Sequence, residues 1–204
     1  MVLTRGQIEE NLRGKGEFVK IDHLNRFLRE ADSLDIKKFI LTKLASIYEE
    51  KGFLSDAARN YDAAADIVTT FKEKIDFYMK EAELYVKIGK FEVADQAFQK
   101  AYASGNSKDK IECQEKYRKL YYIEAEKHEK AMMMRKAAEI YEKIYSMPQP
   151  EDQRAKAKNK LLDLYNRLGK IRDYNRLASK VESKPEEKPK IVPGSFEDLG
   201  IRKY

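Results

Sequence analysis

Apolar residues recur at intervals of three and four along most of the chain, which is the spacing of one face of an α-helix. The segment 18–32 shows this stripe at its simplest, with Phe18, Ile21, Leu24, Phe27, Leu28 and Ala31. The same periodicity predicts helices near residues 18–32, 36–51, 54–70, 73–88, 91–104, 107–130, 134–146, 151–168 and 171–182. Residues 4–12 are compatible with a short further helix. Because no proline occurs before residue 148, long helices are expected.

A pattern of six small and aromatic positions recurs along the chain. Its first copy is Ala45, Tyr48, Gly52, Ala57, Tyr61 and Ala64. A shift of 37 residues gives the second copy, Ala82, Tyr85, Gly89, Ala94, Phe98 and Ala101. A shift of 43 then gives a degenerate copy, Ala125, His128, Met132, Ala137, Tyr141 and Ile144. A last shift of 37 gives Leu162, Tyr165, Gly169, Tyr174, Ala178 and Val181. An internal repeat of this length predicts stacked helical units.

Helix packing explains the spacing. Ala45 and Tyr48 are three residues apart and share one face of a helix. Gly52 is suited to end that helix, because glycine adopts the left-handed conformation that follows a helix C-terminus. The alanines of the following helix allow two backbones to approach closely, and the aromatic ring fills the space beside them. One pair of helices cannot bury its apolar face alone, so the pairs are expected to stack.

The pattern Ala-x-x-Tyr-x-x-x-Gly-x-x-x-x-Ala-x-x-x-Tyr-x-x-Ala resembles the tetratricopeptide repeat. The resemblance implies an all-α fold, a right-handed helical-repeat solenoid of about four helix pairs. We expect N-terminal capping helices in 1–37 and a repeat domain at 38–182, with repeats near 38–74, 75–117, 118–154 and 155–182. The steps of 37 and 43 residues exceed the family's usual 34. Longer repeats with alanine pairs, as at 57–58 and 137–138, also resemble those of soluble NSF attachment proteins.

The resemblance further implies a non-enzymatic adaptor whose concave groove binds a peptide or helix of a partner protein. Projecting the family's groove positions onto this chain gives Phe39, Glu49, Met79, Glu83, Lys119, Tyr122, Glu126, Lys156, Asn159 and Arg167. Ser46, Glu83, Glu126 and Asp163 occupy positions where chaperone-binding members use asparagine, and carboxylates there would repel an acidic tail. We therefore expect a basic or amphipathic helical ligand, bound by a monomer.

Basic residues outnumber acidic ones between 150 and 182. The candidate basic face consists of Arg154, Lys158, Lys160, Arg172, Arg176 and Lys180. Such a face suits the phosphates of RNA or of an anionic membrane, and it is equally compatible with a solvated surface. A nucleic-acid- or ribosome-associated protein is therefore the second hypothesis. An attachment-protein-like adaptor of membrane traffic is the third.

The last segment, 183–204, is rich in proline and charge, and we expect no fixed structure there. It ends in SFEDLGIRKY, whose apolar residues Phe196, Leu199, Ile201 and Tyr204 form a candidate linear binding motif. The alternatives are a tail that binds nothing and a tail that folds back onto the groove.

Little in the sequence suggests catalysis or a cofactor. The chain has two histidines, His23 and His128, which are far apart, and the single cysteine Cys113 has no histidine near it in sequence. RGKGEF at 13–18 lacks the order of a phosphate-binding loop. We expect no metal and no cofactor, and we expect a reducing, cytoplasmic location because one cysteine cannot form an internal disulfide. Met132, Met133 and Met134 are expected to fill an irregular helix interface, and an exposed apolar patch is the alternative.

Overall fold

The computed structural model describes residues 4–179, and it contains ten helices and no strand in that part of the chain. The helices are α1 (Arg5–Leu12), α2 (Glu17–Glu30), α3 (Leu34–Glu50), α4 (Leu54–Ile67), α5 (Phe71–Lys87), α6 (Phe91–Ser104), α7 (Ser107–Lys130), α8 (Met134–Ser146), α9 (Glu151–Arg167) and α10 (Ile171–Ala178). The helical segments predicted from periodicity are all present, including the short one near residues 4–12. The expected motif at Phe196, Leu199, Ile201 and Tyr204 and the expected basic residue Lys180 lie outside the described residues.

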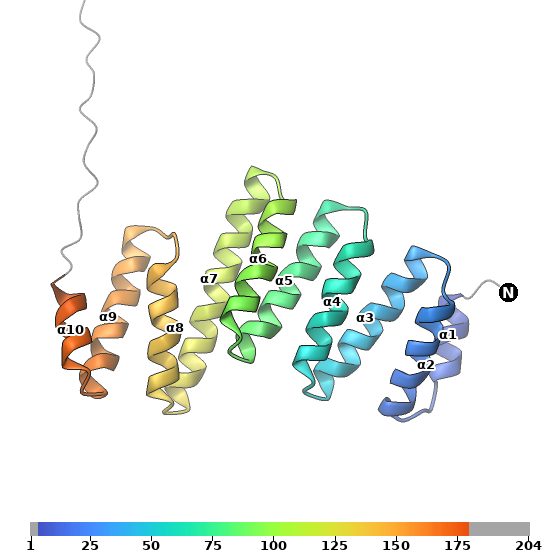
Figure 1. The fold of residues 1–204 in the computed structure, drawn as a ribbon, viewed down its shortest axis with the longest axis horizontal. Helices are drawn as coiled ribbons and strands as arrows, with labels where there is room; N and C mark the ends of the chain where they lie inside the picture. Colours follow the sequence, from blue (N-terminus) through green and yellow to red (C-terminus); the bar gives the residue numbers. More distant parts are fainter. Residues whose placement is uncertain (1–3, 180–204) are drawn as a thin grey trace, which may run out of the picture.

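The helices stack as antiparallel pairs into an elongated array, with the even-numbered helices in front of the odd-numbered ones (Figure 1). The pairs α3–α4, α5–α6, α7–α8 and α9–α10 follow α1 and α2, which cover the N-terminal end. The chain is thus an all-α, tetratricopeptide-like helical-repeat solenoid, as the repeat pattern predicted. The first helices of the four pairs begin at Leu34, Phe71, Ser107 and Glu151, a few residues before the repeat starts predicted near 38, 75, 118 and 155.

The four turns within these pairs share one geometry. Gly52, Gly89 and Gly169 have φ of 79°, 76° and 67°, and Met132 takes the same place in the third pair with φ of 58°. In each turn the residue after the left-handed one donates its N–H to the carbonyl five residues earlier, as from Phe53 to the carbonyl of Tyr48 at 2.8 Å. Glycine therefore stands where the backbone is left-handed, and the third turn keeps that conformation although its glycine is missing.

Small residues form the contacts between helices, as the repeat pattern predicted. Ala45, Ala57, Ala82 and Ala94 are completely buried. The aromatic ring of the second helix lies beside them, and the hydroxyl of Tyr61 donates to Glu49 at 2.7 Å. Buried apolar residues of the four pairs form one continuous core. Packing between successive pairs therefore stabilises the array, since no pair has a core of its own.

The N-terminal cap has a separate apolar cluster. Ile8 and Leu12 of α1 and Leu24 of α2 pack against Ile36 and Ile40 of α3. The cap is further held by an ion pair between Arg5 and Asp35. These contacts cover the face of α3 that has no preceding repeat.

The longer step of 43 residues has a simple structural cause. α7 has 24 residues, whereas α3, α5 and α9 have 17 each, so α7 begins two turns earlier than its counterparts. The capping box of Asn106 and Asp109 starts this extension. α7 contacts α5 directly, and it packs less extensively on α6 than α5 does on α4. The packing between the second and third pairs thus differs from that between the first and second.

A buried carboxylate lies between α4, α5 and α6. Glu81 is 5% exposed, and its Oε2 atom has no hydrogen-bond partner. Burial, and then the nearby charge of Asp62, raise the pKa of Glu81 from 4.5 to about 7. Lys100 moderates this effect while it binds Asp62 at 2.6 Å.

Candidate functional site

The candidate site is a groove between α5 and α7, the first helices of the second and third pairs. It contains a hollow of about 340 Å³. The lining residues are Asp76, Met79, Lys80 and Glu83 of α5 and Lys116, Lys119, Leu120 and Ile123 of α7. The hollow exists because α7 approaches α5 at this junction, so that side chains of two successive first helices face one another.

The floor of the groove is apolar. Met79 is 9% exposed and Leu120 packs against the core, whereas Ile123 is 54% exposed. When a ligand covers a branched apolar side chain that was exposed to water, the complex is stabilised by roughly 1–2 kcal/mol for full burial. The floor therefore offers an apolar anchor point with one open side.

The two walls of the groove carry opposite charges. Asp76, Lys80 and Glu83 stand on α5, with a net charge of −1, whereas Lys116 and Lys119 stand on α7. Asp76 and Lys119 are exposed and form no ion pair within residues 4–179. Lys116 is held by Glu112 at 2.7 Å. The groove can therefore orient a ligand whose two sides differ in charge.

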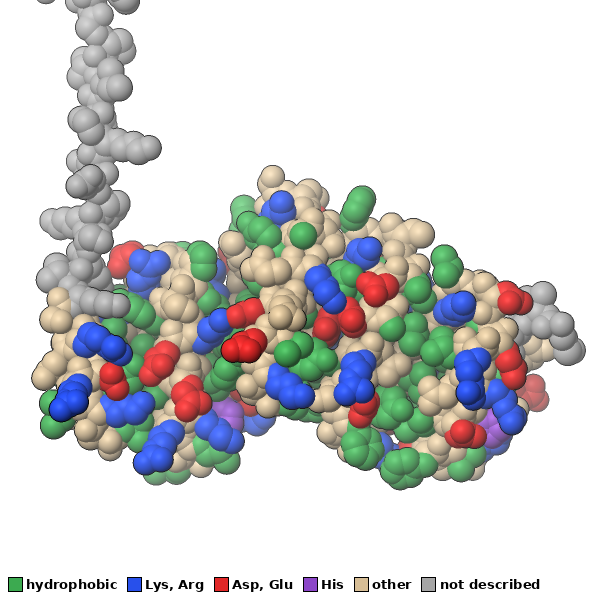
Figure 2. Space-filling view, viewed as in Figure 1, with side chains coloured by type: hydrophobic (Ala, Val, Ile, Leu, Met, Phe, Trp, Pro, Cys, Tyr) green, Lys and Arg blue, Asp and Glu red, His purple; other side chains and the backbone are tan. Residues whose placement is uncertain are grey.

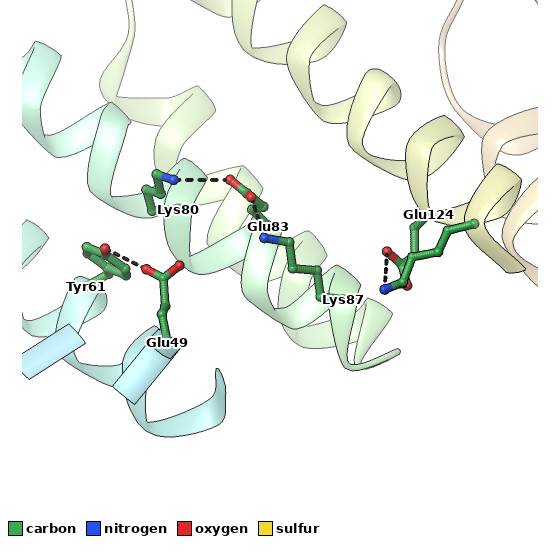
Figure 3. Close-up of polar contacts among 7 residues, drawn as sticks. Glu49, Tyr61, Lys80, Glu83, Lys87 and Glu124 are labelled. Carbon is green, nitrogen blue, oxygen red and sulfur yellow. Dashed lines mark hydrogen bonds and ion pairs between the residues drawn. The ribbon is translucent and has the colours of Figure 1, made fainter. Parts of the chain in front are cut away.

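Glu83 is the most constrained of these charges. It accepts from Lys87 at 2.7 Å and lies 3.6 Å from Lys80, so that one carboxylate is held between two ammonium groups (Figure 3). Partial burial raises the pKa of Glu83, but the hydrogen bond from Lys87 and the charge of Lys80 outweigh it and keep the pKa below its usual value. Glu83 therefore stays ionised at neutral pH and offsets the charge of Lys80, so that Asp76 gives the α5 wall its net negative charge.

A smaller hollow of about 80 Å³ continues the groove toward the start of α7. Cys113 lines it but is 2% exposed, and burial raises the pKa of its thiol. A buried thiol with a raised pKa is a poor nucleophile, so Cys113 acts here as a small packing residue.

The structure brings three of the predicted groove residues together around the hollow, namely Met79, Glu83 and Lys119. Other predicted positions make intramolecular contacts. The cations of Arg5 and Lys43 lie over the ring of Phe39 at 5.6 and 5.5 Å.

Glu49 accepts from the Tyr61 hydroxyl, which fixes it on the second helix of its own pair (Figure 3). Tyr122 donates to the carbonyl of Gln153 at 3.2 Å and so joins α7 to α9. The remaining predicted positions, Glu126, Lys156, Asn159 and Arg167, are exposed and do not line the hollow.

Leu120, Ile123 and Lys116 were not predicted as groove residues. The position of Ile123 could have indicated the groove from sequence. It lies outside the stripe formed by the buried residues Tyr117, Tyr121 and Ala125 of the same helix. An apolar residue off the buried stripe marks a surface that something else can cover.

The predicted basic face is partly neutralised by acidic neighbours. Lys160 binds Glu129 at 2.9 Å, Arg176 binds Asp173 at 3.0 Å, and Arg154 lies 3.8 Å from Glu151. Lys158 on α9 and the exposed Arg172 on α10 complete the described part of the face.

A second hollow of about 390 Å³ lies between α6, α7 and α8. The rings of Phe98 and Tyr117 stack beside it with centroids 4.2 Å apart. Its charged groups bind one another, since Asp95 accepts from Tyr117 and pairs with Lys143, and Arg118 donates to the carbonyl of Pro148 at 2.9 Å. These contacts join the second and third pairs and leave fewer free groups than the α5–α7 groove.

None of the helices between residues 4 and 179 combines the length and apolar character that crossing a bilayer requires. In the same part of the chain no three His, Cys, Asp or Glu side chains are grouped as a metal ion would need.

No protein-family model matches the chain, and no curated protein matches it in sequence. The similarities found are with solved structures, each at low identity. The crystal structure of MamA is 18% identical with a TM-score of 0.41, and the match covers 87% of this chain and 95% of MamA. BtubC (BKLC) from P. vanneervenii is 14% identical with a TM-score of 0.40, covering 84% and 74% of the two chains. A putative kinesin light chain with TPR-like repeats from Podosopora anserina is 13% identical with a TM-score of 0.39, covering 85% and 84%. Function is therefore inferred from the geometry of this chain alone.

Proposed function

We propose that this protein is a non-enzymatic interaction scaffold that binds an amphipathic helix or peptide of a partner protein in the groove between α5 and α7. The observation that supports the proposal most directly is the exposed Ile123 at the edge of an apolar floor, between an acidic wall and a basic wall. Helix-in-groove recognition uses this combination of a hydrophobic seat and flanking charges.

The charges of the walls define the ligand further. A bound helix would place its apolar residues on Met79, Leu120 and Ile123. Its basic side would face Asp76 and Glu83 on α5, and its acidic side would face α7. The apolar contacts would supply most of the affinity, and the charges would set orientation and association rate.

A pair of isoleucines on α7 allows a matched test. Ile123 lines the groove, whereas Ile111 is similarly exposed, at 61%, and lines no described hollow. We would compare full-length protein with Ile123→Asp and Ile111→Asp in affinity capture from a cell extract, with and without nuclease treatment. Both residues are exposed, so both variants should fold, and circular dichroism would verify this.

The proposal expects the same proteins to be captured by wild type and by Ile111→Asp, and to be lost with Ile123→Asp. Equal losses in the two variants would refute the groove as the site. Disappearance of all captured material after nuclease treatment would favour the nucleic-acid hypothesis in place of the scaffold.

A further inference from the structure

The two long edges of the solenoid differ in composition. The turns within the pairs, together with the α1–α2 turn, all lie on one edge, which is the lower edge in Figure 1. We define the turn edge as the five stretches from the last residue of the first helix to the third residue of the second. These stretches are 12–19, 50–56, 87–93, 130–136 and 167–173. The connections between pairs, defined in the same way, are 30–36, 67–73, 104–109 and 146–153 and form the opposite edge.

The net charge of the chain resides on the turn edge. Its five stretches contain eleven Lys and Arg against five Asp and Glu. The opposite edge contains two Lys and Arg against seven Asp and Glu. Because the whole sequence has 41 basic and 35 acidic residues, thirty of each remain outside the turn edge. The molecule is therefore basic along the turn edge and acidic along the opposite edge.

Helix dipoles do not explain this asymmetry. Acidic residues favour helix starts and basic residues favour helix ends. Each edge contains both kinds of terminus, since every stretch joins the end of one helix to the start of the next. A preference arising from helix stability would therefore act on both edges alike.

The basic side chains of the turn edge are largely available. Nine of the eleven form no ion pair within residues 4–179. Lys15 is half-buried and donates to Asn11, and the other eight are exposed: Arg13, Lys51, Lys90, Lys130, Arg135, Lys136, Lys170, which lies over the ring of Tyr165, and Arg172. Among the acids of the same edge, Glu17, Asp56 and Asp173 are each paired with a neighbouring Lys or Arg. The pairing thus leaves an excess of free positive charge.

The turn edge also exposes apolar side chains. Six of the eleven exposed large hydrophobic residues of the described chain lie on it: Phe18, Val19, Phe53, Met132, Met133 and Ile171. Phe18 and Phe53 contact each other across two turns, with ring centroids 6.5 Å apart. Figure 2 shows apolar groups with neighbouring Lys and Arg at both ends of the lower edge. The expectation that the methionines fill an interface is wrong for Met132 and Met133, which are 76% and 47% exposed.

The α5–α6 turn differs from the other turns in its position and in its lack of exposed apolar side chains. In Figure 1 it is set back from the level of the other turns. It exposes no large apolar residue, and Phe91 packs against Tyr121 with ring centroids 5.5 Å apart. Ile171, at the equivalent place in the α9–α10 turn, is 69% exposed. Large apolar side chains are therefore exposed at the four turns that extend furthest and not at the α5–α6 turn, which is set back.

Met132 adds an independent observation. It occupies a left-handed position, with φ of 58°, where the other three pairs have glycine. A side chain there strains the backbone, and an exposed methionine gains little packing to offset that strain. The requirements of the fold therefore do not account for this residue.

We propose that the turn edge is a peripheral docking face for an anionic lipid bilayer. The free Lys and Arg side chains contact the headgroups, and Phe18, Met132 and Ile171 enter the interfacial region beside them. Basic residues combined with protruding apolar residues suit a membrane surface. A nucleic acid backbone offers phosphate but no apolar region for Met and Ile, which is why lipid is the better match. This face is separate from the α5–α7 groove.

Vesicle co-sedimentation of the full-length chain tests the proposal. The vesicles consist of phosphatidylcholine alone or of phosphatidylcholine with phosphatidylserine. Binding to the anionic vesicles only is expected, weakening as salt is added. Lys130→Gln, Arg135→Gln and Lys136→Gln combined should reduce partitioning about a hundredfold, at roughly fivefold for each basic residue. Met132→Gln combined with Ile171→Gln, which leaves the charge unchanged, should reduce it roughly tenfold.

A control variant on the opposite edge combines Phe71→Gln, Lys72→Gln and Lys108→Gln and should bind as wild type does. Ile123→Asp should also keep vesicle binding, which separates this proposal from that of the groove. Three results would overturn it: absence of binding to anionic vesicles, equal losses in the control variant, or no effect of the apolar pair. Salt-sensitive binding of a labelled RNA duplex, unaffected by the apolar pair and without vesicle binding, would assign the edge to nucleic acid instead.

Discussion

Glu81→Gln should stabilise the protein at alkaline pH and not at acidic pH. Glu81 is buried between α4, α5 and α6, with Asp62 and Asp66 nearby and only Lys100 to offset them. Glutamine keeps the size of the side chain and resembles the protonated acid, which is the form that this site favours. The substitution therefore removes a buried negative charge without creating a cavity.

The magnitude follows from the pKa, which burial and Asp62 raise from 4.5 to about 7. Below pH 4 both the folded and the unfolded chain hold the proton, and Glu81 contributes nothing to stability. Between the two pKa values the folded chain binds the proton that the unfolded chain releases, so stability falls as pH rises. One pH unit corresponds to about 1.4 kcal/mol, which gives a destabilisation of about 3 kcal/mol above pH 7. We expect the advantage of Glu81→Gln to be about 2 kcal/mol greater at pH 8 than at pH 5.

Urea unfolding followed by circular dichroism at pH 5 and pH 8 would measure the difference. Glu83→Gln is the matched control, two residues away on the same helix. Its carboxylate has a lowered pKa, so it contributes stability above its unfolded pKa, and that stability is lost as pH falls. Glu83→Gln should therefore weaken the protein slightly at pH 8, by less than about 1 kcal/mol. If Glu81→Gln is equally stable or less stable at pH 8, the carboxylate is not destabilised by burial and the reasoning fails.

Four other substitutions test the turns and the packing by thermal or urea unfolding. Gly89→Ala should lower the free energy of unfolding by about 1 kcal/mol, because φ is 76° there, although no atom lies within 4 Å of the added Cβ. Met132→Gly should leave the stability equal or higher. The opposite result for the two variants would contradict the left-handed turn. Tyr61→Phe should cost about 1–2 kcal/mol through loss of the hydroxyl bond to Glu49, and an unchanged stability would show that this bond contributes nothing. Ala82→Leu should cost more than about 2 kcal/mol because Ala82 is fully buried between helices, and a neutral result would mean that the interface can expand.

Local signals in the chain predicted the helices and their turns well. The apolar stripe of each helix and the glycines at 52, 89 and 169 depend on interactions within a few residues, so they are legible without a tertiary structure. The third turn shows the limit of such signals. Met132 gives no indication of a left-handed turn, yet packing of α7 on α8 imposes the same hydrogen bonds there.

The groove was predicted only in part. Met79, Glu83 and Lys119 follow from the register of the repeat, and all three line the hollow. Phe39 occupies an equivalent position, but the N-terminal cap supplies the cations that cover it. A residue at a groove position of the repeat is accessible to a ligand only if no neighbouring helix or side chain covers it. The repeat pattern itself does not specify which segment packs there.

The sequence by itself determined the helical pairs, their stacking and the number of turns, because periodicity and glycine act over short distances along the chain. Only the tertiary structure decided which surfaces stay uncovered. The two extra turns of α7 and its approach to α5 leave Ile123 exposed over an apolar floor, and the alignment of five turns gathers scattered Lys and Arg into one basic edge. Both features join residues far apart in sequence, and their spacing depends on how whole helices pack.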